Sequence, residues 1–269
     1  MNRQGTPYVR KRRMEKQSHV LSVLEGMGTV QSSSARLAEI GIRFSYPKPI
    51  NLIRYFLKVG SATEGVVVDF FAGSGTFAEA VISMNREESA ECRFICIQLP
   101  EPIDAPVDLM NTVGDLCRER IRRVAIDSDL VDKPQGVKSF LLSPSNFKQW
   151  RGDGIETPQA LAEQMKMFVD GDKPGAETEW KLYELLLKFG QELTTPIETM
   201  ALSGHRVFAI RERQMLFVLD TFAEDMIQSL LALKPREIVA LDAVFRNADP
   251  LKTNLDLQCR DAGVKFTCL

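Results

Sequence analysis

Val66-Val67-Val68-Asp69-Phe70-Phe71-Ala72-Gly73-Ser74-Gly75-Thr76 is the stretch of this sequence that decides its fold. The run from Val66 to Phe71 is β-branched and aromatic, which predicts a buried strand. From Thr76 to Asn85 the apolar residues resume helical spacing, so the glycines mark a turn between a strand and a helix. A second apolar run, from Arg93 to Leu99, predicts another strand. Together these elements predict a βαβ unit with a right-handed crossover and a parallel sheet, and therefore an α/β fold.

The glycine turn suits a nucleotide-like ligand with an anionic end, because glycine permits close backbone approach and free N–H groups favour negative charge. The segment Gly73 to Ala78 also satisfies the dinucleotide fingerprint, which alone is a weak signal. Asp69 favours S-adenosylmethionine, since a carboxylate would repel a pyrophosphate but accept hydrogen bonds from a methionyl ammonium group. Gln98 or Glu101, at the end of the second strand, is expected at the ribose hydroxyls. An NAD-dependent oxidoreductase and a purely structural turn role for Asp69 remain open.

Composition excludes several classes of protein. The 34 basic and 36 acidic residues give a net charge of −2, so any contact with DNA must be local. The five cysteines are scattered, which predicts neither a disulfide framework nor a zinc site and fits a reducing cytoplasm. No apolar run has the length of a signal or a membrane span, so we expect a cytoplasmic protein without membrane contact.

The chain divides into three expected parts. Residues 1–43 are polar and lack sustained apolar periodicity, which predicts a linker or tail whose basic run at residues 10–13 is a solvated surface. Residues 44–150 hold the glycine turn, and a Pro/Gly-punctuated region near 150 precedes a second α/β module over residues 151–269. The patterns predict helices over 109–126, 158–168, 176–189, 222–233 and 250–261, a hairpin of strands over 205–211 and 215–219, and strands over 237–241 and 264–268.

A family resemblance rests on Phe44-Ser45-Tyr46-Pro47-Lys48-Pro49 followed by Asp69 through Thr76. These segments resemble consecutive cofactor motifs of β-class adenine-N6 DNA methyltransferases, in particular the Mod subunits of type III restriction-modification systems. The similarity covers most of the chain, through residues 98–102, 118–123, 145–150 and 251–254. It implies a Rossmann-like S-adenosylmethionine-binding half with a parallel sheet, then a smaller α/β C-terminal module for subunit contact. The residues that it places at the cofactor are Pro47, Lys48, Asp69, Phe70, Phe71, Ala72, Gly73, Ser74, Gly75 and Thr76.

The catalytic tetrapeptide of that family, Asp-Pro-Pro-aromatic, does not occur in residues 1–269. Methyl transfer to an exocyclic amine needs acceptors that orient the nitrogen and an aromatic face that stacks the flipped base. We therefore assign no catalytic residue and no metal site, and expect the chain to be inactive alone. The expected partners are DNA through a separate recognition region, a complementing N-terminal methyltransferase half and a restriction subunit. A nonenzymatic docking remnant of a Mod subunit is the alternative.

Overall fold

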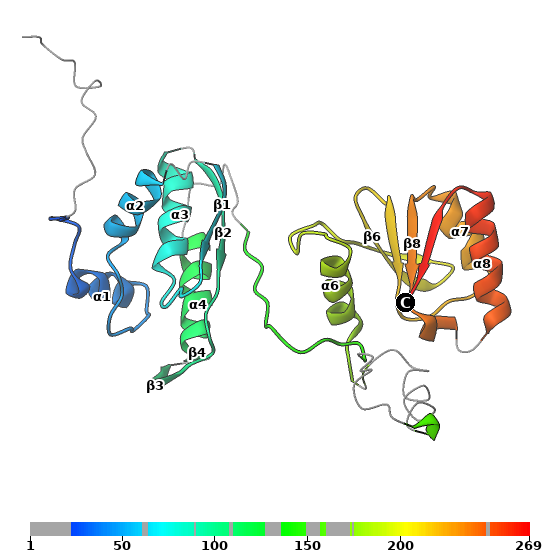
Figure 1. Ribbon diagram of the computed structural model, residues 1–269. Coiled ribbons are helices and arrows are strands. Elements are labelled where there is room, and N and C mark those ends of the chain that lie inside the picture. Colours follow the sequence, from blue (N-terminus) through cyan, green and yellow to red (C-terminus); the bar gives the residue numbers. More distant parts are fainter. Residues whose placement is uncertain are drawn as a thin grey trace, which may run out of the picture. The chain divides into compact units, whose positions relative to one another are not determined.

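The computed structural model describes residues 23–60, 64–88, 90–107, 110–126, 136–148, 157–159, 173, 175–245 and 248–269. The chain forms two compact units, Met1–Ser139 and Phe140–Leu269 (Figure 1). The boundary between the two units lies between Ser139 and Phe140, earlier in the chain than the boundary expected near residue 150. Each unit has its own strands and its own buried apolar residues, so each is described by itself.

The first unit contains the predicted βαβ unit. Strands β1 (Glu64–Asp69) and β2 (Glu91–Cys96) pair in parallel, from Glu64 opposite Glu91 to Asp69 opposite Cys96. Helix α3 (Thr76–Glu87) connects them. The other elements of this unit are helices α2 (Ile50–Val59) and α4 (Val113–Ile126) and the antiparallel pair β3 (Pro102–Val107) and β4 (Met110–Thr112). The α/β class and one parallel strand pair are confirmed, whereas the helix expected over 109–126 begins at Val113 because residues 110–112 pair as a strand.

One face of the β1–β2 sheet is packed and the other is uncovered, so the expectation of a fully buried strand was wrong. Helices α2, α3 and α4 lie on the same side of the two strands (Figure 1). Val67 and Phe94 pack there against buried residues of α2 and α3, and Phe94 also packs against α4. The opposite face keeps Val66 46%, Val68 40%, Ile95 51% and Ile97 46% exposed. Apolar side chains therefore occupy both faces, but the described residues of this unit cover only one.

Part of the segment expected to be a linker is folded into the first unit. Helix α1 (Val30–Glu39) is capped by Thr29, whose hydroxyl accepts a hydrogen bond from Ser32 N while the Ser32 hydroxyl accepts one from Thr29 N. Leu37 and Ile42 are fully buried and cluster with Met110 and Leu116. The sequence missed this helix because it offers few apolar residues. The basic run at residues 10–13 lies outside the described residues.

The second unit is a five-stranded mixed sheet in the order β5-β6-β7-β8-β9. Its strands are β5 (Glu198–Leu202), β6 (His205–Ile210), β7 (Met215–Val218), β8 (Glu237–Ala240) and β9 (Lys265–Cys268). Strands β5, β6 and β7 run antiparallel, and β7, β8 and β9 run parallel. The predicted hairpin, the strand over 237–241 and the last strand are confirmed.

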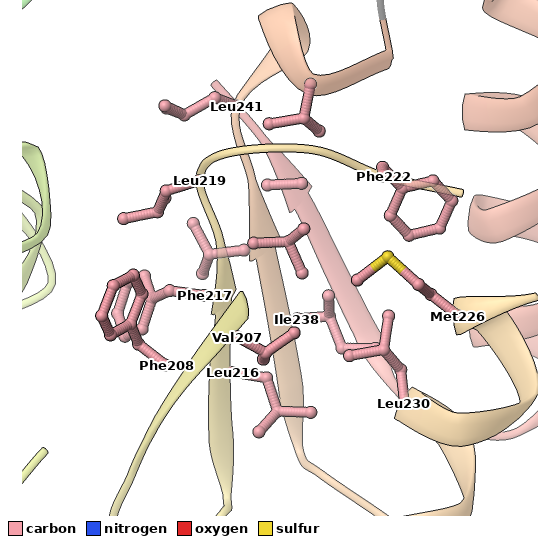
Figure 2. Close-up of a cluster of buried hydrophobic side chains, with 14 of the residues drawn as sticks. Val207, Phe208, Leu216, Phe217, Leu219, Phe222, Met226, Leu230, Ile238 and Leu241 are labelled. Atoms are coloured by element: carbon pink, nitrogen blue, oxygen red, sulfur yellow. The ribbon is translucent and has the colours of Figure 1, made fainter. Parts of the chain in front are cut away.

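Helices of the second unit are α6 (Thr178–Lys188), α7 (Met226–Ala232) and α8 (Asp249–Asp261), with a 3₁₀ turn η2 (Asp242–Phe245). Figure 2 shows Phe208 and Phe217 on one side of the sheet and Met226 and Leu230 on the other. Phe189, at the end of α6, meets Phe217 edge to face at 6.0 Å between ring centroids. The helix expected over 222–233 is shorter, since Phe222 precedes α7, and the helix expected over 158–168 lies mostly outside the described residues.

Candidate functional site

The turn after β1 is held by hydrogen bonds within the protein. Asp69 Oδ1 accepts from Phe71 N at 3.0 Å, and Gln98 Oε1 accepts from Gly73 N at 2.8 Å. Backbone bonds join Ala72 N to the Ile97 carbonyl at 3.1 Å and Gly75 N to the Ala72 carbonyl at 2.8 Å. The turn therefore stays beside the end of β2, and Asp69 does serve as a turn residue.

The glycines adopt the left-handed backbone conformation that the turn requires. Gly73 has φ +52° and Gly75 has φ +82°. A Cβ at Gly73 would meet only the Phe71 carbonyl oxygen, at 3.9 Å, so that side of the turn faces open space. Without a side chain at Gly73, a ligand has direct access to the backbone there.

A cavity of about 240 Å³ lies against this turn. Its walls come both from the segment that ends at Lys48 and from the turn that follows β1, although the two are distant in sequence. Its lining residues are Phe44, Tyr46, Lys48, Ile53, Asp69, Phe71, Ala72, Gly73, Ser74, Thr76 and Phe77. The lining offers a carboxylate, an ammonium group, aromatic faces and the first turn of α3, whose amide groups have no intrahelical acceptors. Such a set suits a zwitterionic ligand with an aromatic part.

Two thiols lie behind the turn and are poorly suited to nucleophilic chemistry. Burial raises the pKa of Cys96 to about 12 and that of Cys117 to about 11. In both cases a nearby Asp69 charge acts in the same direction, while Arg120 opposes it at Cys117. Since the thiolate is the reactive form, both side chains act as small apolar groups.

Comparison with known proteins identifies the relatives of this chain. A family model described as DNA methylase, N6_N4_Mtase, matches residues 7–103, which include the cavity. The Mod subunit of the type III restriction-modification enzyme EcoP15I from Escherichia coli is 26% identical over 242 residues, 86% of this chain. The StyLTI Mod subunit from Salmonella typhimurium is 40% identical over 219 residues, 70% of this chain. The chain is thus similar in sequence to type III Mod subunits.

The chain spans about a third of the length of these relatives, 36% of the EcoP15I subunit and 33% of the StyLTI subunit. The EcoPI Mod subunit of Escherichia phage P1, 28% identical over 228 residues, is covered to 34%. The expected resemblance to Mod subunits is therefore confirmed. Among the described helices of this chain, none is long and apolar enough to cross a membrane.

Most of the residues predicted for the cofactor site come together in the cavity: it is lined by Lys48, Asp69, Phe71, Ala72, Gly73, Ser74 and Thr76. Pro47, Phe70, Gly75, Gln98 and Glu101 are not among the lining residues, although Gln98 and Gly75 shape the turn. The sequence missed Phe44, Tyr46, Ile53 and Phe77 as lining residues. Phe44 and Tyr46 belong to the segment that carries the family resemblance, so that motif was the available signal.

A shallow hollow of about 670 Å³ adjoins the cavity over α1 and is lined by Val30, Gln31, Ser34, Ser45 and Tyr46. Tyr46 is the only ionisable group in that lining, and it also lines the smaller cavity. The chemistry-bearing side chains gather around the smaller cavity, which is therefore the candidate site.

Proposed function

We propose that this chain supplies the S-adenosylmethionine-binding part of a site-specific DNA adenine-N6 methyltransferase of the type III restriction-modification kind. The observation that carries the proposal is the cavity, since it joins Tyr46 and Lys48 to the turn from Asp69 to Thr76. These are the two segments that resemble consecutive cofactor motifs of the family. Their meeting at one cavity, within a unit that matches a DNA methylase model, supports a common ligand.

The residues present fit the methionyl end of S-adenosylmethionine. Asp69 Oδ1 is occupied by Phe71 N, and Oδ2 has no hydrogen-bond partner among the described residues, so it is available to an ammonium group. Thr76 and Phe77 begin α3 and line the cavity, so their amide groups are placed for a carboxylate. When bound, S-adenosylmethionine supplies an electrophilic sulfonium methyl group, while the residues of this chain bind and orient it.

The ribose contact is proposed for Glu101, which directly precedes β3 and has an exposed side chain. Gln98 is the other candidate from the sequence, but its amide oxygen already accepts a hydrogen bond from Gly73 N. We therefore give Gln98 a role in shaping the turn. Pro47 and Phe70 stay predicted neighbours of the cofactor.

The catalytic groups are proposed to come from a complementing methyltransferase half, which can be another segment of a longer chain or a separate polypeptide. The cavity of about 240 Å³ is smaller than the roughly 300 to 1,000 Å³ of ligand pockets, so it suits one end of the cofactor. Parallel sheets are normally covered on both faces, and the uncovered face of β1–β2 gives such a half a surface to pack on. The match covers only 36%, 34% and 33% of the lengths of the three relatives, which leaves room in such proteins for that half and for DNA recognition.

The second unit is proposed to make subunit contacts, including contacts with a restriction subunit. Its core is formed by buried apolar residues of the sheet and of helices α6, α7 and α8. Figure 2 shows part of this core, including residues of the sheet and of α7. That core gives the unit a stable scaffold of its own. No chemistry-bearing constellation distinguishes the described part of this unit, so a binding role is the simpler proposal.

Isothermal titration calorimetry of the chain with S-adenosylmethionine and with NAD tests the function directly. We expect saturable binding of S-adenosylmethionine and none of NAD. Binding of NAD alone would favour the oxidoreductase alternative. A folded chain that binds neither ligand would contradict the proposal and favour a docking remnant.

A further inference from the structure

Arg120 on α4 is one of the largest fully buried side chains of the first unit, with an exposed fraction of 2%. Its Nε donates to Glu79 Oε2 at 2.7 Å, and the Glu79 side chain is 1% exposed. Burial lowers the pKa of Arg120, and Glu79 counteracts that effect. A guanidinium group stays charged in proteins, so α3 and α4 are joined by a buried ion pair.

The same guanidinium also donates hydrogen bonds to the glycine turn. Arg120 Nη1 lies 3.2 Å from the Ser74 carbonyl oxygen, 3.0 Å from Ser74 Oγ and 2.9 Å from Thr76 Oγ1, and donates to all three. Ser74 and Thr76 flank Gly75, the residue at which the chain passes from the turn into α3. One buried nitrogen therefore fixes both sides of the left-handed residue.

A second arginine completes the network from α1. Arg36 Nε donates to Glu79 Oε1 at 2.8 Å, and Arg36 Nη2 lies 2.5 Å from the same oxygen. Glu79 is thus shared by two guanidinium groups, so the three side chains carry one net positive charge. That charge lies next to the first turn of α3, where it reinforces the attraction of the helix N-terminus for an anion.

We propose that Arg120 is a positioning residue of this turn, which sets the affinity for the carboxylate-bearing end of the ligand by fixing Ser74 and Thr76. The inference rests on the proposed function, because it takes S-adenosylmethionine as the ligand. It assigns specificity for the amino-acid end of the cofactor to a residue that does not line the cavity.

The test compares Arg120→Lys with Arg86→Lys. Lysine keeps a positive charge near Glu79, and its single nitrogen cannot reproduce the guanidinium contacts on both sides of Gly75. Arg86 is a matched control because it also joins α3 to α4, by donating to the carbonyl oxygens of Val124 and Ala125 at 2.8 and 3.2 Å, without touching the turn. Urea unfolding and near-UV circular dichroism establish that each variant is folded.

Calorimetry is expected to show that Arg120→Lys raises the Kd for S-adenosylmethionine at least about tenfold, while Arg86→Lys leaves it within about twofold. The Kd for methylthioadenosine, which lacks the amino-acid end, should stay unchanged in both variants. The proposal is overturned if Arg120→Lys binds S-adenosylmethionine like the unaltered chain. Equal weakening by both variants, or equal weakening for both ligands, would overturn it as well.

Hydrogen exchange of the Gly75 amide, which donates to the Ala72 carbonyl at 2.8 Å, gives a second readout that needs no ligand. We expect exchange to be at least about tenfold faster in Arg120→Lys than in Arg86→Lys, because the turn opens locally. If the unaltered chain binds no S-adenosylmethionine, the proposed function is wrong, and this exchange rate alone decides whether Arg120 positions the turn. Equal rates in the two variants would show that it does not.

Discussion

Gly75 lies directly against Cys117, so the glycine turn and α4 are packed without room for a side chain. A Cβ at Gly75 would be 3.2 Å from Cys117 Sγ and 3.3 Å from the Cys117 carbonyl oxygen. Gly75 also has φ +82°, a conformation that residues with a Cβ rarely adopt. Space and backbone conformation therefore both require glycine here, whereas Gly73 is constrained by conformation and by the cavity.

Gly75→Ala should destabilise the first unit by roughly 1 to 3 kcal/mol. The substitution strains the backbone at Gly75 and brings the new Cβ too close to the Cys117 carbonyl oxygen, which as a backbone atom cannot easily move away. Urea unfolding measures the change. Gly136→Ala is the control, since a Cβ there would meet no atom within 4 Å. Equal stability of the two variants would contradict the packing described for the turn.

Gly73→Val should separate binding from folding. Its Cβ would enter open space, so the cost in stability comes mainly from φ +52°, while the side chain occupies room beside the cavity that the cofactor needs. We expect the affinity for S-adenosylmethionine to fall at least about tenfold, with a smaller fall for Gly73→Ala. Binding like that of the unaltered chain, measured by calorimetry on folded Gly73→Val, would mean that the turn is only structural.

Asp69→Ala should weaken S-adenosylmethionine binding roughly tenfold or more, because a charge-assisted hydrogen bond contributes about 1.5 to 3 kcal/mol. Asp69→Asn distinguishes the two roles of this side chain. An amide oxygen can still accept the hydrogen bond from Phe71 N, but the negative charge toward an ammonium group is lost. Calorimetry showing normal affinity for Asp69→Asn would leave Asp69 with its turn role alone.

Asp115 should make the free energy of unfolding of the first unit depend on pH in the acidic range. Its Oδ2 accepts from Thr112 Oγ1 at 2.8 Å, Thr112 N at 2.9 Å and Asn111 N at 3.1 Å, at the start of α4. The hydrogen bond from the Thr112 side chain, together with those from the backbone and the charge of Arg118, lowers the pKa of Asp115 below its ordinary 3.8. A lowered folded pKa stabilises the fold above about pH 4, and this contribution is lost as pH falls through the folded pKa.

Asp115→Asn should therefore lower the free energy of unfolding by about 1 kcal/mol at pH 7. The difference from the unaltered chain should shrink below about pH 4, where the aspartate itself becomes neutral. Urea titrations at a series of pH values measure both chains. A difference that is independent of pH would show that the charge of Asp115 plays no part.

The purified chain should bind S-adenosylmethionine without catalysing methyl transfer to DNA. Without acceptors for the adenine N6 hydrogens and a stacking aromatic, a flipped base lacks a preorganised pocket, and much of the roughly 7 to 11 kcal/mol available from orientation is lost. Incubation with tritiated S-adenosylmethionine and mixed-sequence duplex DNA is expected to leave no labelled N6-methyladenine. Label above a no-enzyme control would mean that the chain holds its own catalytic residues. Activity restored by a separate polypeptide with Asp-Pro-Pro-aromatic would support a complementing half.

Local patterns predicted the strand, turn and helix around Asp69, and they did so because a β-branched run, two glycines and helical spacing are local signals. Strand β5 was missed because it lies at the edge of the sheet and is specified by its pairing with β6. The two strands are joined by a turn of Ser203 at φ 50° and Gly204 at φ 81°. The site residues Ile53 and Phe77 were missed for a related reason. From sequence alone, an apolar residue on a helix is interpreted as part of the hydrophobic core. Only the packing of α2 beside α3 places Ile53 and Phe77 at a cavity.

The sequence by itself determined the α/β class, the glycine turn and the kinship with Mod subunits, because each depends on short segments whose residue types have few alternative uses. Only the tertiary structure decided which face of β1–β2 is covered, that Leu37 and Ile42 belong to the first unit, and that Arg120 holds the turn. Arg120 lies in a run of arginines that reads as an exposed, ion-paired helix face. Its burial follows from where α4 meets α3 and the carboxylate of Glu79, which are contacts between segments about forty residues apart. Such contacts depend on how helices pack, and no local pattern specifies them.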